Sequence, residues 1–172
     1  FVARYDTQKD HETLFQALAI LRDRGRYPTC LLVGTGMDDS NLAVTAKLRD
    51  LGLTDQVRLL GRRSDIPAIM NALDLHILSS SAEAFPNVLA EAMACGTPCV
   101  STDVGDAAEI VGESGWIVPP GNPPSLAEAI GDALDTAGES GWAARREAAR
   151  RRIEDRFSID RMAREYRKIW FA

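Results

Sequence analysis

Two glutamates separated by seven residues, Glu83 and Glu91, place a pair of carboxylates in one short stretch of the chain. A carboxylate accepts two hydrogen bonds from a vicinal diol such as that of a ribose or a hexose. Glu83 precedes a predicted helix start at Pro86, and Glu91 lies inside that helix. At a rise of about 1.5 Å per residue, the two carboxylates lie on opposite sides of the helix start. Their order matches the sugar and the ribose of a nucleoside diphosphate sugar.

The helix start between the two glutamates is a candidate site for the diphosphate. Pro86 suits the first helical position, because its ring sets a helical φ and its missing N–H is not needed there. The backbone amides that follow have no partner within the helix and attract anions. The residues predicted to contact the donor here are Phe85, Pro86, Asn87, Val88 and Leu89.

A diphosphate also needs positive charge, which Arg4 and Lys9 supply at the end of the first apolar segment. Charge-assisted hydrogen bonds of about 1.5–3 kcal/mol each would neutralise the diphosphate without a metal ion. The sequence has no cluster of His and Asp with metal-ligand spacing. We therefore expect no metal and no other cofactor.

Short apolar runs alternate with helical patterns, which is typical of a parallel sheet covered by helices. Strands are predicted at 30–33, 57–60, 75–78, 98–101 and 116–118. Helices are predicted at 10–24, 40–51, 65–73, 86–95, 106–111 and 124–137, with two more at about 142–155 and 159–170. The predicted fold class is α/β, a Rossmann-like parallel sheet with helices on both faces. Ligands bind such folds at the carboxyl ends of the strands, so the loops there should carry the chemistry.

Length and composition predict one domain over residues 1–172, with 45% hydrophobic and 26% charged residues. Phe1 opens within an apolar run, so we expect a fragment of a longer polypeptide. No apolar run approaches the ~20 residues that span a bilayer, which predicts a soluble domain. The three cysteines, Cys30, Cys95 and Cys99, form no Cys-x-x-Cys pair and are expected to be buried free thiols in a reducing cytoplasm.

The net charge of −5 is unevenly distributed, because residues 139–172 hold ten basic against six acidic side chains. Such an acidic body argues against duplex nucleic acid as a partner. The basic end is interpreted as a solvated helix face, with contact to an anionic membrane surface or a partner domain as alternatives.

These motifs together resemble the C-terminal, donor-binding domain of the retaining glycosyltransferases of family 4, which have the two-domain GT-B fold. The shared features are the Glu83-x7-Glu91 spacing, the Arg4-x4-Lys9 pair, and the segments Leu-Val-Gly-Thr-Gly at 32–36 and Val-Arg-Leu-Leu-Gly at 57–61. The resemblance extends from Phe1 to about Phe171. Ala3 and Ala84 depart from it, since glycine is common in the family at both positions.

The resemblance implies a role for each residue of the motif. Arg4 and Lys9 would hold the diphosphate and stabilise the leaving group. Glu83 would bind the transferred sugar, and Glu91 the ribose. The turn with Gly34 and Gly36 would let the backbone approach the donor, or serve only as a strand-to-loop turn. The segment with Gly61 and Arg62 would lie along the nucleobase.

The resemblance also implies retention of anomeric configuration, no divalent metal, and an absent N-terminal domain that binds the acceptor. It is strongest to bacterial members that build O-antigen, capsule or exopolysaccharide on glycan or lipid-linked acceptors, with a UDP sugar favoured over a GDP sugar. We expect a cytoplasmic enzyme, with peripheral contact at the inner face of the membrane as an option. The isolated domain is expected to bind donor but to transfer little or no sugar.

Two other functions remain open from the residues alone. A nucleotide-sugar epimerase of GT-B architecture would need further catalytic carboxylates and a histidine at the sugar ring. A flavodoxin-like binding module without enzyme activity would share the α/β pattern through fold alone.

Several further side chains have a structural interpretation. His76 is expected to be a satisfied histidine of a strand, and His11 is a minor candidate for a place near the phosphate. The hydroxyls of residues 79–81 are expected to line a sugar pocket. Gly105 and Asp106 would border that pocket, or Asp106 would serve only as a helix cap. Packing within the last two helices is expected of Trp142, Trp170 and Phe171. The resemblance offers an alternative, in which the last helix crosses back to the N-terminal domain and its apolar face is exposed in this chain.

Overall fold

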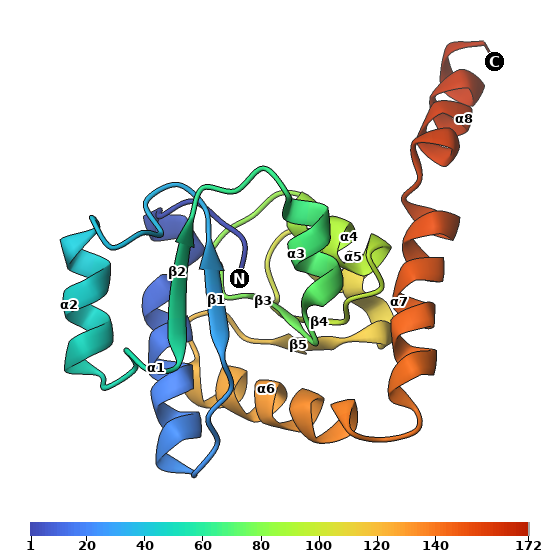
Figure 1. The fold of residues 1–172 in the computed structure, drawn as a ribbon. Coiled ribbons are helices and arrows are strands. Elements are labelled where there is room, and N and C mark those ends of the chain that lie inside the picture. Colours follow the sequence, from blue (N-terminus) through green and yellow to red (C-terminus); the bar gives the residue numbers. More distant parts are fainter. Residues whose placement is uncertain (172) are drawn as a thin grey trace.

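The computed structural model describes residues 1–171 and has an α/β fold (Figure 1). The strands are β1 (Cys30–Val33), β2 (Val57–Gly61), β3 (His76–Leu78), β4 (Cys99–Thr102) and β5 (Trp116–Val118). All of their pairings are parallel. The helices are α1 (His11–Asp23), α2 (Leu42–Asp50), α3 (Ile66–Ala72), α4 (Asn87–Ala94), α5 (Ala107–Val111), α6 (Pro123–Ala137), α7 (Trp142–Arg156) and α8 (Ile159–Trp170). Two short 3₁₀ helices complete the order, η1 (Thr7–Lys9) and η2 (Gly112–Ser114). Every predicted strand and helix is confirmed, with ends shifted by one or two residues where caps set them.

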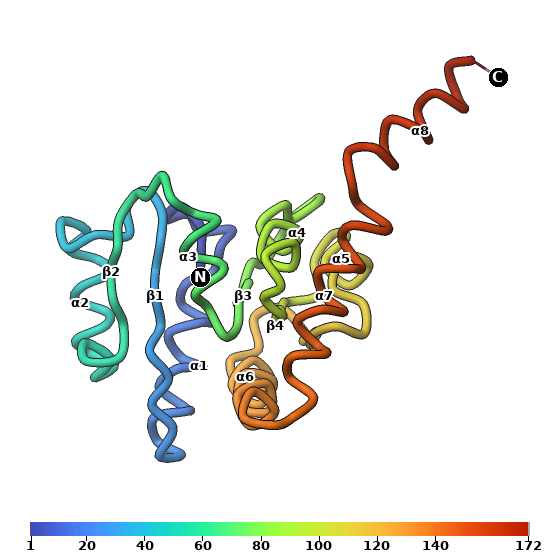
Figure 2. Tube along the Cα trace, turned by 45° about the vertical axis from the view of Figure 1, so that its right-hand side comes forward, coloured from blue at the N-terminus to red at the C-terminus, as the bar shows by residue number. Residues whose placement is uncertain are grey.

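The predicted parallel sheet is divided into two ladders, β1–β2 and β3–β4–β5. The segment between them, Phe1 to Ala3, makes only an isolated bridge through Val2 to Val33. Its backbone continues the pattern of β1, since the terminal ammonium group of Phe1 and the amide of Ala3 donate to the carbonyls of Leu31 and Val33 at 2.9 Å each. Figure 2 shows this end of the chain between β1 and β3.

Helices cover both faces of the strands, as predicted. Successive side chains of a strand point to opposite faces, and the two buried clusters divide them in this way. Ile77 and Val100 join the cluster formed with α1 and α6, whereas Leu78 and Cys99 join the cluster formed with α3, α4, α5 and α7. The interior therefore has two apolar layers, one on each side of β3 and β4.

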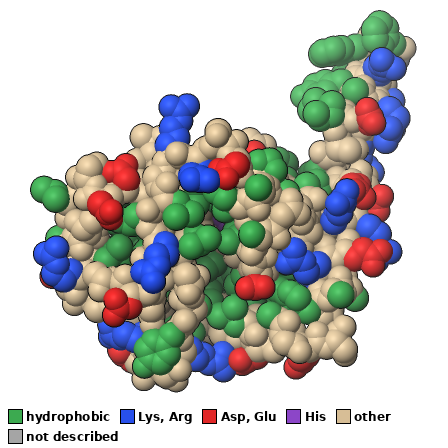
Figure 3. All heavy atoms as spheres, in the orientation of Figure 1, with side chains coloured by type: hydrophobic (Ala, Val, Ile, Leu, Met, Phe, Trp, Pro, Cys, Tyr) green, Lys and Arg blue, Asp and Glu red, His purple; other side chains and the backbone are tan. Residues whose placement is uncertain are grey.

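The last helix, α8, projects away from the body of the domain (Figures 1 and 2). None of its residues is buried, and Trp170 and Phe171 are 72% and 82% exposed. The expectation that these two aromatic residues pack within the last two helices was therefore wrong, whereas the alternative, a last helix whose apolar face is exposed in this chain, agrees with the structure. Trp142 does pack, with its ring 6.5 Å from that of Trp116. Figure 3 shows the exposed apolar side chains of α8 gathered together.

The three cysteines are free, as predicted; Cys30 and Cys99 are buried and Cys95 is half-buried. Within residues 1–171, no helix combines the length and apolar character needed to cross a membrane.

Candidate functional site

The central contact of the site joins η1 to the loop that follows β3. The Nζ atom of Lys9 lies 2.5 Å from Oε1 of Glu83, although the two residues are 74 positions apart. Their side chains are 21% and 14% exposed, so the pair is largely removed from water. The sequence placed both residues at the carboxyl edge of the strands, and the structure brings them into direct contact.

Arg4 belongs to a separate ion pair. Its guanidinium lies 3.1 Å from a carboxylate oxygen of Asp6, and the Arg4 side chain is 66% exposed. The amide of Gln8 and the Arg4 guanidinium hold the pKa of Asp6 below its usual value. Sequence reasoning missed Asp6, although a carboxylate two residues after an arginine was a visible signal. The Arg4 guanidinium must therefore break its ion pair with Asp6 before it can bind another anion.

The start of α4 differs in detail from the prediction. Pro86 is the N-cap, with ψ at 85°, and the helix begins at Asn87. This non-helical ψ keeps Pro86 outside the first turn, so its predicted place at the first helical position was wrong by one residue. The amide of Leu89 already donates to the carbonyl of Pro86 at 3.0 Å. Among the residues described, the amides of Asn87 and Val88 remain without a protein acceptor.

The side chains of this segment point in different directions. Leu89 is fully buried in the core. Phe85 is 40% exposed, and its ring lies 6.0 Å from that of Phe157 at the end of α7. Asn87 and Glu91 are exposed, and Val88 is half-buried. An anion at this helix start would therefore meet backbone amides, with Glu91 farther along the same helix.

The glycines of the β1 and β2 loops pack on the chain itself. The amide of Gly34 donates to the carbonyl of Gly61 at 2.9 Å, and a Cβ at Gly34 would overlap the carbonyl of Ala3. A Cβ at Gly36 would come within 3.0 Å of Cβ of Tyr5. The close approach of the Ala3 backbone to Gly34 and of the Tyr5 side chain to Gly36 thus accounts for glycine at both positions, which supports the interpretation as a strand-to-loop turn. Arg62 follows Gly61 and is exposed.

The hydroxyls after β3 point inward. Ser79 and Ser80 are fully buried. The Ser79 hydroxyl lies 3.0 Å and 2.9 Å from the carbonyls of Lys9 and Asp10, and the Ser80 hydroxyl donates to Glu83 at 2.7 Å. The prediction that these two hydroxyls line a sugar pocket was therefore wrong, since both are engaged within the protein. The third, that of Ser81, belongs to an exposed residue and donates to the carbonyl of Gln8 at 3.3 Å.

Gly105 and Asp106 lie against the Glu83 loop, and Asp106 is the N-cap residue of α5, without a side-chain hydrogen bond to the helix. The amide of Asp106 donates to the carbonyl of Ala84 at 2.9 Å. Thr102, whose hydroxyl donates to the carbonyl of Ser80 at 2.7 Å, was missed. In the sequence it falls one residue after the predicted strand at 98–101, and this position carries no signal for the contact.

Neither histidine is placed to act as a base at the Lys9–Glu83 pair. His76 is fully buried and both of its ring nitrogens lack a partner, so the expectation of a satisfied histidine was wrong. Burial lowers the pKa of His76 to about 3. His11 is packed between the rings of Phe1 and Tyr5, and burial lowers its pKa to about 4. Both histidines are therefore neutral near pH 7 and add no positive charge for a phosphate.

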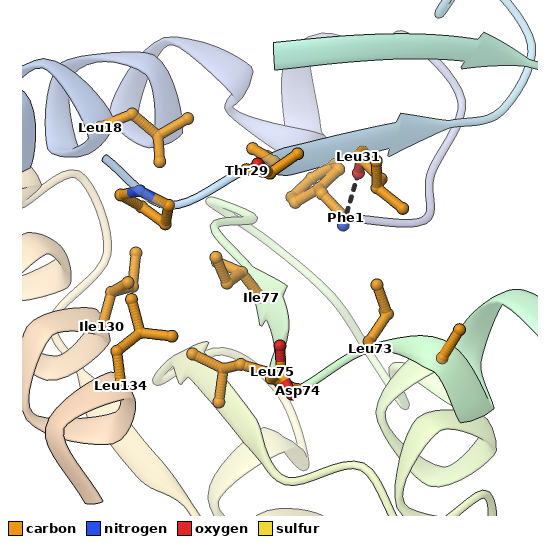
Figure 4. Close-up of a pocket in the computed structure, with 13 residues that line it drawn as sticks. Phe1, Leu18, Thr29, Leu31, Leu73, Asp74, Leu75, Ile77, Ile130 and Leu134 are labelled. Atoms are coloured by element: carbon orange, nitrogen blue, oxygen red, sulfur yellow. Dashed lines mark hydrogen bonds between the residues drawn. The ribbon is translucent and has the colours of Figure 1, made fainter. Parts of the chain in front are cut away.

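A pocket of about 410 Å³ lies at the opposite edge, where β1 and β3 begin. Figure 4 shows Phe1 and Leu31 at one side, with Leu75, Ile77 and Ile130 converging from the others. Its walls are mostly apolar, and none of the predicted site residues lines it. The Lys9–Glu83 pair lies apart from this pocket.

Within residues 1–171, no group of three or more His, Cys, Asp or Glu side chains is arranged to hold a metal ion. The groups that the site presents are the cations of Lys9 and Arg4, the carboxylates of Glu83 and Glu91, and the free amides at the start of α4. This set suits a ligand with both phosphate and hydroxyl groups.

Comparison with known proteins gives a consistent result. The family model described as glycosyl transferases group 1 matches residues 1–136. N-acetyl-alpha-D-glucosaminyl L-malate synthase of Bacillus anthracis is 30% identical over 143 residues, which cover 82% of this chain and 36% of that enzyme.

Solved structures show the same fold. A glycosyltransferase from Rickettsia africae aligns with a TM-score of 0.88 at 28% identity, covering 98% of this chain and 45% of the other. HepE of Anabaena, solved in complex with UDP, aligns with a TM-score of 0.85 at 29% identity, covering 98% of this chain and 47% of the other. The chain thus spans about a third to a half of the length of these three proteins.

Proposed function

The chain belongs to the family of group 1 glycosyl transferases, and we propose that it forms the domain that binds the nucleotide sugar donor, a UDP sugar rather than a GDP sugar. The observation that carries the proposal is the half-buried Lys9–Glu83 pair beside the open start of α4. It offers a cation for phosphate and a carboxylate for sugar hydroxyls at one point. The UDP complex of the Anabaena relative supports the choice of nucleotide.

In this proposal the donor lies across the carboxyl edge of the strands. Glu83 accepts hydrogen bonds from the transferred sugar, and Glu91 from the ribose. Lys9 and Arg4, with the amides of Asn87 and Val88, hold the diphosphate. Fixed cations and amides stabilise negative charge as the nucleoside diphosphate leaves, so the site needs no divalent metal. Backbone near Gly61 and Arg62 borders the nucleobase.

We further propose that the enzyme is a retaining transferase of family 4 that acts in bacterial polysaccharide synthesis. The acceptor, a glycan or a lipid-linked sugar, would bind a second domain, because this chain spans less than half of the Rickettsia and Anabaena proteins. Such an enzyme would work in the cytoplasm or at the inner face of the membrane. The described domain alone would bind donor and transfer little or no sugar.

The proposal is tested by calorimetric titration of the domain with UDP, GDP, ADP and NAD in EDTA. We expect UDP to bind selectively, and Arg4→Ala and Glu91→Ala each to weaken binding about tenfold or more, the loss of one charge-assisted hydrogen bond. Arg150→Ala is the control for Arg4, since Arg150 is 61% exposed and pairs with Glu154 on α7. Glu128→Ala, an exposed glutamate on α6, is the control for Glu91.

The outcomes separate the candidate functions. Equal weakening by the control variants would show a general charge effect and remove Arg4 and Glu91 from the site. Binding of no nucleoside diphosphate by the folded domain would overturn the donor-binding function. Turnover by the domain alone with an acceptor would contradict the assignment of acceptor binding to a second domain.

A further inference from the structure

Three hydroxyl groups next to the Lys9–Glu83 pair are too deeply buried to contact a ligand. Ser79, Ser80 and Thr102 are each fully buried. We infer that they are positioning residues that hold Lys9 and Glu83 in the geometry required for donor binding. This inference rests on the proposed function of Lys9 and Glu83.

Ser80 orients the carboxylate of Glu83. Its hydroxyl donates at 2.7 Å to Oε1, the same oxygen that lies 2.5 Å from Nζ of Lys9. Two donors on one oxygen restrict rotation of the carboxylate. Within residues 1–171, the other oxygen, Oε2, accepts no hydrogen bond and remains for a ligand hydroxyl. Oε1 is thus held by Lys9 and Ser80, and Oε2 is the oxygen that would bind the ligand.

Thr102 fixes Ser80 to the sheet. It is the last residue of β4, which pairs with β3 on one side and β5 on the other. Its hydroxyl donates to the carbonyl of Ser80 at 2.7 Å. A loop residue is thereby tied to the middle strand of the β3–β4–β5 ladder, which is hydrogen-bonded on both sides.

Ser79 holds the turn that carries Lys9. Its hydroxyl lies within hydrogen-bond distance of the carbonyls of Lys9 and Asp10. Asp10 has φ of 44° and is the one described non-glycine residue with positive φ, a conformation that bulky residues avoid. The amide of Ser81 adds a bond of 2.8 Å to the carbonyl of Gln8. Lys9 is therefore fixed through its backbone as well as through its amine.

The chain offers a matched control for Thr102. Thr97 is also fully buried, and its hydroxyl donates to a carbonyl, that of Met70, at the same distance of 2.7 Å. It precedes β4 at the amino end, whereas Thr102 ends the strand. Thr97→Val and Thr102→Val therefore remove equivalent buried hydrogen bonds, and only the second touches the supports of Glu83.

The test is competitive labelling of lysines with acetic anhydride, read by mass spectrometry on the ligand-free domain. Lys168, 69% exposed on α8, serves as the internal reference for Lys9, which is 21% exposed. We expect Ser80→Ala and Thr102→Val each to raise the Lys9 to Lys168 ratio about threefold or more, because a loosened pair exposes the amine. Thr97→Val should leave the ratio unchanged, and Thr102→Ser should restore it.

An unchanged ratio in folded Ser80→Ala and Thr102→Val would overturn the inference, as would an equal rise in Thr97→Val. Circular dichroism and thermal melting establish that each variant is folded. Because the labelling uses no ligand, its result is independent of UDP binding. A domain with the expected labelling that binds no UDP would reject the proposed function and keep the support of Lys9 by these hydroxyls.

Discussion

Gly105 packs directly against the backbone of Glu83, and a Cβ at position 105 would overlap the carbonyl oxygens of Glu83 and Ala84. Gly105 also has φ of +51°, a conformation that costs most residues about 1–2 kcal/mol. The loop after β4 therefore sets how far the Glu83 loop extends toward a ligand.

Gly105→Ala should reduce the free energy of unfolding by about 2–4 kcal/mol, through the left-handed backbone and the overlap together. Gly121→Ala is the control, since Gly121 has φ of +63° and nothing within 4 Å of its Cβ position. It should lose only about 1 kcal/mol. Urea denaturation measures both. Equal losses would mean that the loops shift to accept the methyl group.

Asp10 combines two local requirements in one residue. Its side chain accepts hydrogen bonds from the amide of Thr13 at 3.1 Å and from the Thr13 hydroxyl at 2.6 Å, and its backbone is left-handed. Asp10→Ala should therefore cost about 2 kcal/mol of unfolding free energy. Asp10→Gly, which tolerates the backbone, should cost a few tenths. If Asp10→Gly reduced the unfolding free energy as much as Asp10→Ala, the side-chain cap and not the left-handed backbone would set the stability of this turn.

The two buried histidines should make the domain less stable in mild acid. Their folded pKa values, about 4 for His11 and about 3 for His76, lie below the unfolded value near 6.5. The folded state therefore binds fewer protons, and stability is lost as the pH falls below about 6.5. At about pH 5 each histidine should cost about 2 kcal/mol relative to neutral pH.

His76→Leu isolates one of these contributions. Both ring nitrogens of His76 lack partners, so an apolar side chain of similar size should be neutral or stabilising at pH 7. The variant should lose about 2 kcal/mol less than the wild-type chain between about pH 7 and about pH 5. Urea denaturation at both pH values measures the difference. An identical loss of unfolding free energy in the two proteins would show that the pKa of His76 is the same in the folded and the unfolded states.

The apolar face of α8 should contribute little to the stability of the domain. Ile169 is 74% exposed, so Ile169→Glu should change the unfolding free energy by no more than about 0.5 kcal/mol. Ile130→Ala, in the buried cluster with α1, should lose about 3 kcal/mol. Thermal melting distinguishes them. A loss above about 1 kcal/mol for Ile169→Glu would place α8 against the body in solution.

The sequence by itself determined the order and kind of the elements and the positions of Arg4, Lys9, Glu83 and Glu91 along them. These features are local. Periodic apolar residues specify a helix or strand, a side chain such as Asp10 specifies where a helix starts, and parallel strands bring the loops after them to one edge. For the same reason the helix boundaries were right to within a residue or two, Pro86 included.

Only the tertiary structure decided which charged groups meet. From the sequence alone, Lys9 could pair with Glu83 and Arg4 with Asp6, or Lys9 with Asp6 and Arg4 with Glu83. The fold selects the first arrangement, because it sets the distance between η1 and the loop after β3. The inward hydroxyl of Ser79, the unpartnered ring of His76 and the unsupported α8 also depend on neighbours distant in sequence. Periodicity shows that a residue faces inward, but its hydrogen-bond partner is set by the packing of separate elements.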